Sequence, residues 1–109
     1  MTAKTNTPLI VRISIGHFQP DQLEVVAQKL TASETKLRPA IEKLEGYIAY
    51  YVAIDNDKHY MTNVSIWKTL KNARQMDTLK EMLDLRKEFE PLRIEFMPIT
   101  NHEVLWHVQ

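Results

Sequence analysis

Aliphatic and polar side chains alternate near the start of the chain. Every second position from residue 9 carries an aliphatic side chain: Leu9, Val11, Ile13 and Ile15. The positions between them carry one aliphatic residue followed by polar or small ones: Ile10, Arg12, Ser14 and Gly16. Because a period of two is that of a strand, residues 9–17 are predicted to form the first β-strand.

A helical period replaces this alternation after Pro20. Apolar residues recur three, four or seven positions apart: Leu23, Val26, Leu30 and Leu37. Pro20 suits the first position of a helix, and Gly46 suits a position just past its end. Since proline inside a helix removes a backbone donor, we expect the helix to break or kink at Pro39 and to restart through Ile41 and Leu44.

A hairpin is predicted next. Residues 47–54 are rich in aromatic and β-branched side chains, and the turn Asp55-Asn56-Asp57-Lys58 leads to a second strand over residues 59–67. If the turn has an even length, residues directly opposite share a face. The face of Trp67 then carries Ile48, Tyr50, Val52, Ile54, His59, Met61, Asn63, Ser65 and Trp67. The other face carries Tyr47, Ala49, Tyr51, Ala53, Tyr60, Thr62, Val64 and Ile66.

A second helical pattern fills the region from residue 70 to residue 89. Its apolar positions are Leu70, Ala73, Met76, Leu79, Leu83 and Phe89, and Pro91 follows them. The run Thr78-Leu79-Lys80-Glu81 has the form of a capping box, which favours two shorter helices meeting near Asp77. Two short strands, over residues 96–99 and 103–108 around Thr100-Asn101, are expected to finish the chain.

The order of elements indicates an α+β fold. A β-α-β-β-α-β order with an appended strand is that of a ferredoxin-like domain, in which two helices cover one face of an antiparallel sheet. We expect one such domain over residues 9–109, after a polar tail over residues 1–8. Both faces of the hairpin are largely apolar, so the second face is predicted to be covered by another subunit.

Composition narrows the function classes. The 109 residues carry 14 Lys and Arg against 14 Asp and Glu, a balance that argues against a nucleic-acid surface. Cysteine is absent, which excludes disulfides, thiolate metal sites and a cysteine nucleophile and fits a cytoplasmic protein. With two glycines there is no phosphate-cradling loop, and the sequence shows neither a signal-peptide core nor a membrane span.

A family resemblance rests on particular residues. Leu44-Glu45-Gly46 followed by Tyr50, and a third strand closing on Ser65-Ile66-Trp67 ahead of a helix, resemble the antibiotic biosynthesis monooxygenase (ABM) domain of the dimeric α/β barrel superfamily. The resemblance covers residues 9–108. It implies a homodimer in which two sheets pack face to face. It also implies a last strand that reaches the partner subunit, and residues 101–109 suit that role. A small molecule would lie between the sheet and the helices.

The predicted cleft follows from the hairpin and from this resemblance. Its expected lining is Asn63, Ser65 and Trp67, with Tyr50, Met61 and His59 farther along. A wide apolar cleft with a few fixed polar groups orients a planar organic ligand. The alternative is that Trp67 belongs to the core and that Asn63 and Ser65 bond to helix ends.

The histidines and Arg12 are the other candidates for chemistry. His17 is the candidate base, because a neutral imidazole at the end of the first strand can take a proton from a phenol; the alternative is a surface histidine. Arg12 is expected to contact the partner subunit or to pair with a carboxylate. His102 and His107 are expected to point to opposite faces, so no metal site is predicted.

The family contains several chemistries. Its haem-degrading members use an Asn on the first strand, a Trp on the third and a His on the next helix; only Trp67 matches, which argues against haem. Its quinol and polyketide monooxygenases use no metal or flavin. The leading hypothesis is therefore a homodimer that binds a planar phenolic or quinol-type molecule and oxygenates it without a cofactor.

Two alternatives remain at this point. A non-catalytic ligand-binding or stress-related dimer would be favoured if Met61, Met76 and Trp67 filled the cleft completely. An isomerase or decarboxylase on the same fold would need a charged base in the cleft, for which His17 is the candidate.

Overall fold

The strands form one antiparallel sheet in the computed structural model, which describes residues 8–108. Their bounds are β1 Ile10–His17, β2 Tyr47–Asp55, β3 Tyr60–Trp67, β4 Glu95–Phe96 and β5 Thr100–Glu103. The order across the sheet is β2-β3-β1-β4, and β5 also pairs with β1. Apart from Pro8, the predicted polar tail lies outside the described residues.

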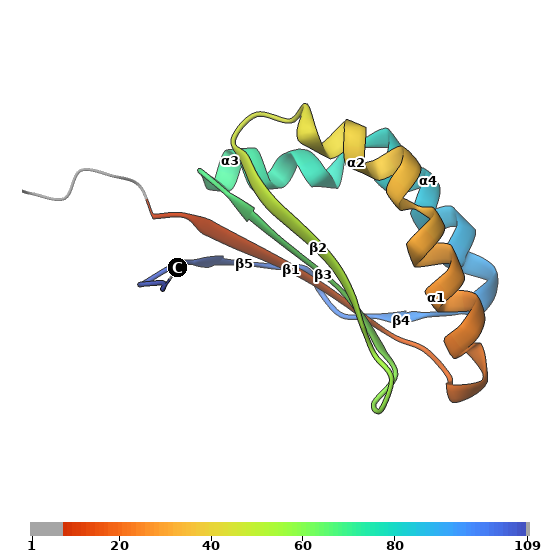
Figure 1. Cartoon of the computed structure of the whole chain (residues 1–109). Helices are drawn as coiled ribbons and strands as arrows, with labels where there is room; N and C mark the ends of the chain where they lie inside the picture. The colour runs from red at the N-terminus through yellow and green to blue at the C-terminus, as the bar shows by residue number, and fades with distance from the viewer. Residues whose placement is uncertain (1–7, 109) are drawn as a thin grey trace, which may run out of the picture.

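All helices lie over one face of this sheet (Figure 1). Their bounds are η1 Pro20–Gln22, α1 Leu23–Ala32, α2 Glu34–Glu42, α3 Leu70–Ala73, η2 Arg74–Asp77, α4 Lys80–Phe89 and η3 Glu90–Leu92. The predicted α+β, ferredoxin-like fold is therefore confirmed. The pairing of two sheets in a dimeric barrel stays a prediction.

The first helical region breaks at Ser33. Of the break or kink predicted at Pro39, the break is wrong. Pro39 lies inside α2. The Ser33 hydroxyl donates to the carbonyl oxygen of Leu30 at 2.6 Å, and such a local bond competes with the helix ladder.

The second helical region does divide near Asp77, as predicted. Its capping box does not form, because α4 starts at Lys80 and its N-cap residue, Leu79, makes no side-chain cap bond.

The hairpin has the predicted register along most of its length. Tyr50 lies opposite Ser65, and Val52 lies opposite Asn63. A bulge at Ile48 then places Tyr47, not Ile48, opposite Trp67, so the predicted face of these two residues is wrong. The rings of Tyr47 and Trp67 are 6.1 Å apart.

The C-terminal strands are displaced from their predicted positions. Thr100, which was expected in a turn, begins β5, and no strand forms over residues 104–108. The last backbone contact along β1 is the bond from the Val104 amide to the Leu9 carbonyl, at 2.9 Å. Beyond it the segment has passed the end of its partner strand, and Leu105 and Trp106 are largely exposed.

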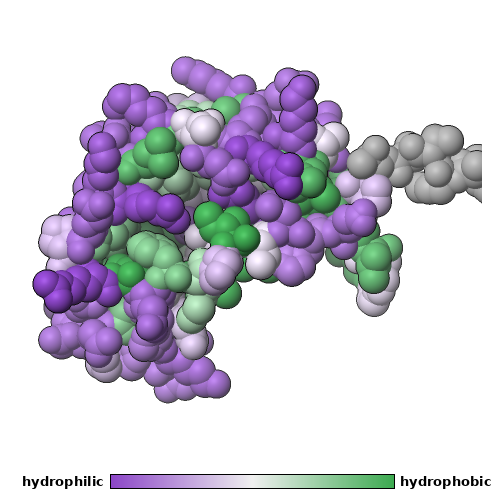
Figure 2. All heavy atoms as spheres, turned by 180° about the vertical axis from the view of Figure 1, so that it is seen from behind, coloured by the Kyte–Doolittle hydropathy of each residue, from purple (hydrophilic) through white to green (hydrophobic). Residues whose placement is uncertain are grey.

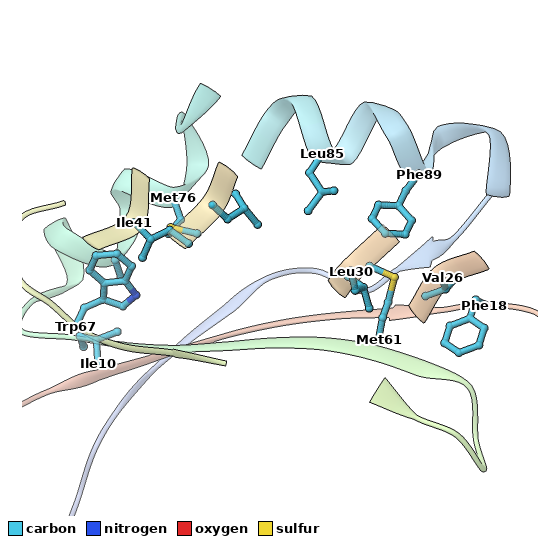
Figure 3. Close-up of a cluster of buried hydrophobic side chains, with 12 residues drawn as sticks. Ile10, Phe18, Val26, Leu30, Ile41, Met61, Trp67, Met76, Leu85 and Phe89 are labelled. Carbon is cyan, nitrogen blue, oxygen red and sulfur yellow. The ribbon is translucent and has the colours of Figure 1, made fainter. Parts of the chain in front are cut away.

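The core has two apolar ends (Figure 3). One end contains Ile10, Ile41, Trp67 and Met76, and the other contains Phe18, Val26, Leu30, Met61, Leu85 and Phe89. The sheet residues between these ends are mostly polar, and they form the candidate site.

Candidate functional site

A block of polar side chains occupies the middle of the helix-facing side of the sheet. Tyr50 of β2, Ser65 of β3 and Arg12 of β1 lie side by side in one row of paired residues. Asn63 and Ser14 are paired in the next row. Asn63 and Ser65 line a cavity together with helix residues, so their face is turned toward the helices. The predicted cleft depended on this orientation. Antiparallel pairing brings such opposite residues within contact distance.

A cavity of about 100 Å³ opens over this block, and we call it the inner cavity. The sheet contributes Arg12, Ser14, Gly16, Tyr50, Met61, Asn63, Ser65 and Phe96 to its lining. The helices contribute Leu30, Met76, Asp77, Met82, Leu83, Leu85, Arg86 and Phe89, and Ile99 completes the lining. Met61 and Met76 therefore line the space without filling it, and the remaining volume would hold about three waters.

Two buried polar atoms in this lining have no partner among the described residues. They are the hydroxyl oxygen of Tyr50 and the side-chain oxygen of Asn63. Burial raises the pKa of the Tyr50 phenol, and the charge of Arg12 opposes that rise. Since a buried unpaired polar group costs about 1–3 kcal/mol, these atoms indicate a place where water or a ligand completes the hydrogen bonding.

Arg12 belongs to the site, and the sequence analysis did not place it there. Its side chain is 7% exposed, and it donates to Asp77 at 2.8 Å, so its predicted pairing with a carboxylate is confirmed. Asp77 lies at the end of η2 and is half exposed. The signal for placing Arg12 was available, because the ferredoxin-like order puts β1 beside β3 and its polar residues beside Ser65.

Trp67 belongs to the core, which was the alternative reading of its role. It is fully buried, and its indole N–H donates to the Ser65 hydroxyl at 2.8 Å. Trp67 is absent from the lining of the inner cavity, so its predicted role as a lining residue is not supported. Ser65 belongs to both the core and the site: its hydroxyl accepts the hydrogen bond of the indole, and the residue also lines the cavity.

Comparison with known proteins gives structural matches only. No protein-family model matches the chain, and no curated protein matches it. A candidate antibiotic biosynthesis monooxygenase from Deinococcus radiodurans matches with a TM-score of 0.70 and 14% identity, over 92% of this chain and 96% of that one. One from Nitrosomonas europaea matches with a TM-score of 0.69 and 14% identity, over 95% and 97%. SnoaB, a cofactor-independent oxygenase from Streptomyces nogalater, matches with a TM-score of 0.60 and 12% identity, over 93% and 97%.

The chain has the ABM-like fold. At these identities the likeness concerns the fold, and the chemistry has to be argued from the side chains of the site. The ABM-like fold places the inner cavity between sheet and helices, where the resemblance of the sequence led us to expect a ligand.

His17 and His59 lie away from the inner cavity. His17 is paired with Tyr60 on the opposite side of the sheet, and its Nδ1 is 4.0 Å from a Glu95 carboxylate oxygen. His59 has a φ of 64° and lies in the hairpin turn, with its ring 5.7 Å from that of Phe18. Neither lines the cavity, so the structure does not support His17 as its base or His59 as part of its lining.

A second depression, which we call the side groove, runs between the edge strand β2 and helices α1 and α2. Its volume is about 400 Å³, and it is mostly apolar. Leu30 and Tyr50 line both the side groove and the inner cavity. The side groove alone has the few hundred Å³ typical of small-molecule sites.

The opposite view of the molecule shows hydrophobic residues in a hollow framed by hydrophilic ones (Figure 2). Two apolar residues of the inner cavity, Leu83 and Phe96, are 42% and 38% exposed. The Arg86 guanidinium lies 5.2 Å from the centre of the Phe96 ring. Leu83 and Phe96 therefore form a partly exposed side of the cavity, and the positive charge of Arg86 lies next to Phe96.

The described residues contain neither a metal-ligand cluster nor a membrane-spanning helix. Within residues 8–108 no group of three or more histidine or acidic side chains is arranged to hold a metal ion. Over the same residues, no helix has both the length and the apolar composition needed to cross a membrane.

Proposed function

We propose that this protein binds an electron-rich phenolic or quinol-type molecule with a polar end in the inner cavity and oxygenates it without a cofactor. The observation that carries the proposal is the pair of unpartnered atoms, the Tyr50 hydroxyl and the Asn63 oxygen, beside Arg12. A phenolic hydroxyl can donate to the Asn63 oxygen and accept from the Tyr50 hydroxyl. SnoaB, a structural neighbour, is named a cofactor-independent oxygenase, which supports the reaction class.

The reaction begins with ionisation of the substrate. Arg12 is the buried cation of the cavity, and a phenolate or enolate formed beside it is stabilised by its charge. Among the described residues that line the cavity, Asp77 is the one carboxylate; it is half exposed, so it is the candidate acceptor for the proton. This assigns to Arg12 and Asp77 the task that the sequence analysis gave to His17.

The substrate anion then passes an electron to dioxygen. In an anthrone-type phenol the keto form carries a ring CH₂ group. A bond forms between that carbon and one oxygen atom, the O–O bond breaks, and CH₂ and O₂ become a carbonyl group and H₂O. The electrons come from the substrate itself, and the apolar lining from Met61, Leu85 and Phe89 keeps bulk water away from the intermediate.

The proposal includes a homodimer formed through the outer face of the sheet. Apolar residues dominate that face in all three long strands: Val11, Ile13, Ile15, Ala49, Tyr51, Ala53, Val64 and Ile66. Tyr51 is 59% exposed in the single chain. We expect Tyr51→Glu to shift the protein from dimer to monomer in sedimentation velocity, and Thr35→Glu on α2 to leave the dimer intact; a wild-type monomer would contradict the dimer.

Oxygen consumption tests the proposed reaction. Purified protein without added metal or flavin is mixed with a panel of hydroquinones, dihydroxynaphthalenes and anthrones, each with and without a carboxylate. We expect uptake above the uncatalysed rate, a loss of at least about tenfold in Asn63→Leu, and full activity in the control His17→Ala.

The results separate the hypotheses. No uptake with any member of the panel would overturn the oxygenase, and ligand binding without uptake would leave a binding protein. Uptake lost in His17→Ala but kept in Asn63→Leu would contradict the assignment of the inner cavity. An isomerase or decarboxylase has less support, since no histidine is among the described residues that line the cavity.

A further inference from the structure

The charges that line the inner cavity do not cancel. Arg12 and Arg86 contribute two positive charges, and Asp77 contributes one negative charge, so the lining carries a net charge of +1. Asp77 is half exposed and therefore partly hydrated, whereas the Arg12 side chain is 7% exposed. At the buried end Arg12 is paired with Asp77, and the surplus positive charge of the lining is that of Arg86.

The hydrogen-bonding capacity of Arg12 is largely unused. A guanidinium has five N–H donors arranged in a rigid fork that matches a carboxylate. The bond to the Asp77 Oδ1 is the one hydrogen bond that the structure shows for this side chain within residues 8–108. The partner is a single oxygen, so the fork is not satisfied by a two-pronged pairing with Asp77.

The neighbours of Arg12 present complementary atoms. Tyr50 and Arg12 flank Ser65 in one row, and Asn63 belongs to the next row. The unpaired oxygen of Asn63 needs a donor. Arg12 bonds to Asp77 through one nitrogen, and its other N–H groups can donate to a second anion. A carboxylate with a hydroxyl on the neighbouring ring carbon offers both within a single small group.

We infer that the ligand of the inner cavity is an aromatic hydroxy acid whose carboxylate is bound by Arg12 and whose adjacent hydroxyl bonds to Asn63. This inference rests on the proposed function and adds the charge of the ligand and the residue that selects it. The small inner cavity takes the hydroxy acid group, and the rest of a fused-ring ligand extends past Tyr50 toward the side groove.

Isothermal titration calorimetry with matched probes tests the inference. The probes are 1-hydroxy-2-naphthoate, its neutral amide, and 1-naphthol, which lacks the acid group. We expect the wild-type protein to bind the naphthoate about ten- to a hundredfold more tightly than the amide, because a hydrogen bond to a charged partner is stronger than one between neutral groups.

Four variants locate the discrimination. In Arg12→Gln the preference for the naphthoate should fall to within about twofold, and in Arg12→Lys it should be intermediate, because a point charge replaces the fork. Asp77→Asn removes the competing carboxylate, raises the net charge of the lining to +2 and should increase the preference. Arg86→Gln removes the second positive charge, over Phe96, and should lower the preference less than Arg12→Gln does. Lys87→Gln is the matched control: Lys87 is exposed on α4 and lines neither the inner cavity nor the side groove, so the preference should remain.

The outcomes are decisive in either direction. The inference is overturned if the wild-type protein binds neither the naphthoate nor its amide, or if it binds the two equally. It is also overturned if the preference for the naphthoate survives in Arg12→Gln and disappears in Arg86→Gln. If Arg12→Gln does not fold by circular dichroism, Asp77→Asn decides, and an unchanged or weaker preference contradicts the inference.

The two proposals fail separately. Oxygen uptake with quinols but no preference for a carboxylate would overturn the charge assignment and leave the oxygenase. A preference for the carboxylate without oxygen uptake from any quinol would overturn the oxygenase and leave the anion site.

Discussion

Replacing Ser65 by alanine removes the hydrogen-bond partner of the buried indole N–H of Trp67. The indole N–H of fully buried Trp67 donates to the Ser65 hydroxyl at 2.8 Å, and Ser65 itself is 2% exposed. Ser65→Ala leaves that N–H unpaired in an apolar surrounding. The cost of an unsatisfied buried donor is about 1–3 kcal/mol, and we expect the free energy of unfolding to fall by that amount.

Urea denaturation followed by circular dichroism measures this change. The protein concentration is held fixed, because association with a second copy would add to the apparent stability. The control is Ser14→Ala on the neighbouring strand: Ser14 lines the same cavity and makes no side-chain hydrogen bond within residues 8–108, so we expect a change within about 0.5 kcal/mol. Should Ser65→Ala match that control, the bond to Trp67 does not stabilise the core and the reasoning is refuted.

Three other variants test the fold and the site. Gly46→Ala should lower the unfolding free energy by about 1–2 kcal/mol from its φ of 75° alone. The loss should be larger because the added Cβ overlaps the Asn72 side chain, and in urea melts a second change, Asn72→Ala, should relieve part of this excess, since the Asn72 Cβ remains 2.9 Å away. The backbone amides of Lys58 and Asp57 lower the pKa of Asp55 below its ordinary value of 3.8. The ionised carboxylate therefore contributes stability above pH 3.8, and this contribution is lost as the pH falls below that value. The stability advantage of wild type over Asp55→Asn, measured in urea melts, should shrink between pH 7 and pH 3. Tyr50→Phe removes an unpaired buried hydroxyl, so it should leave the melting temperature unchanged or raised while weakening ligand binding by calorimetry, and a clear loss of stability would show that the hydroxyl already has a partner.

Part of the candidate site was predictable from the sequence. The alternation over residues 59–67 and the even-length turn placed Asn63 and Ser65 on one face, and the structure confirms their position in the cavity lining. Tyr50 and Met61 were placed there by the same reasoning. The period of a strand and the length of the turn are local properties, so they determined which residues share a face. Which face meets the helices was a condition of the prediction, and the tertiary structure decided it.

The roles of Trp67, Arg12 and His17 were not predictable in the same way. A face of a strand is defined locally, but the depth of a side chain depends on which helix packs above it. Trp67 lies in the closed apolar end of the core with Ile41 and Met76, whereas Arg12 meets the carboxylate of Asp77, 65 positions later in the chain. His17 follows the alternation to the outer side of the sheet, where no helix lies.

The sequence by itself determined the order of strands and helices, because hydrophobic periods, prolines and turn residues act within a few positions of one another. The tertiary structure decided the bulge at Ile48 and the end of β5 near Glu103, whereas the break at Ser33 accompanies a local bond to Leu30. Each of these depends on a partner from another part of the fold or on competition among nearby backbone bonds. The inner cavity has the same origin: its polar block comes from three strands, and its buried cation is paired through a contact that only the folded chain creates.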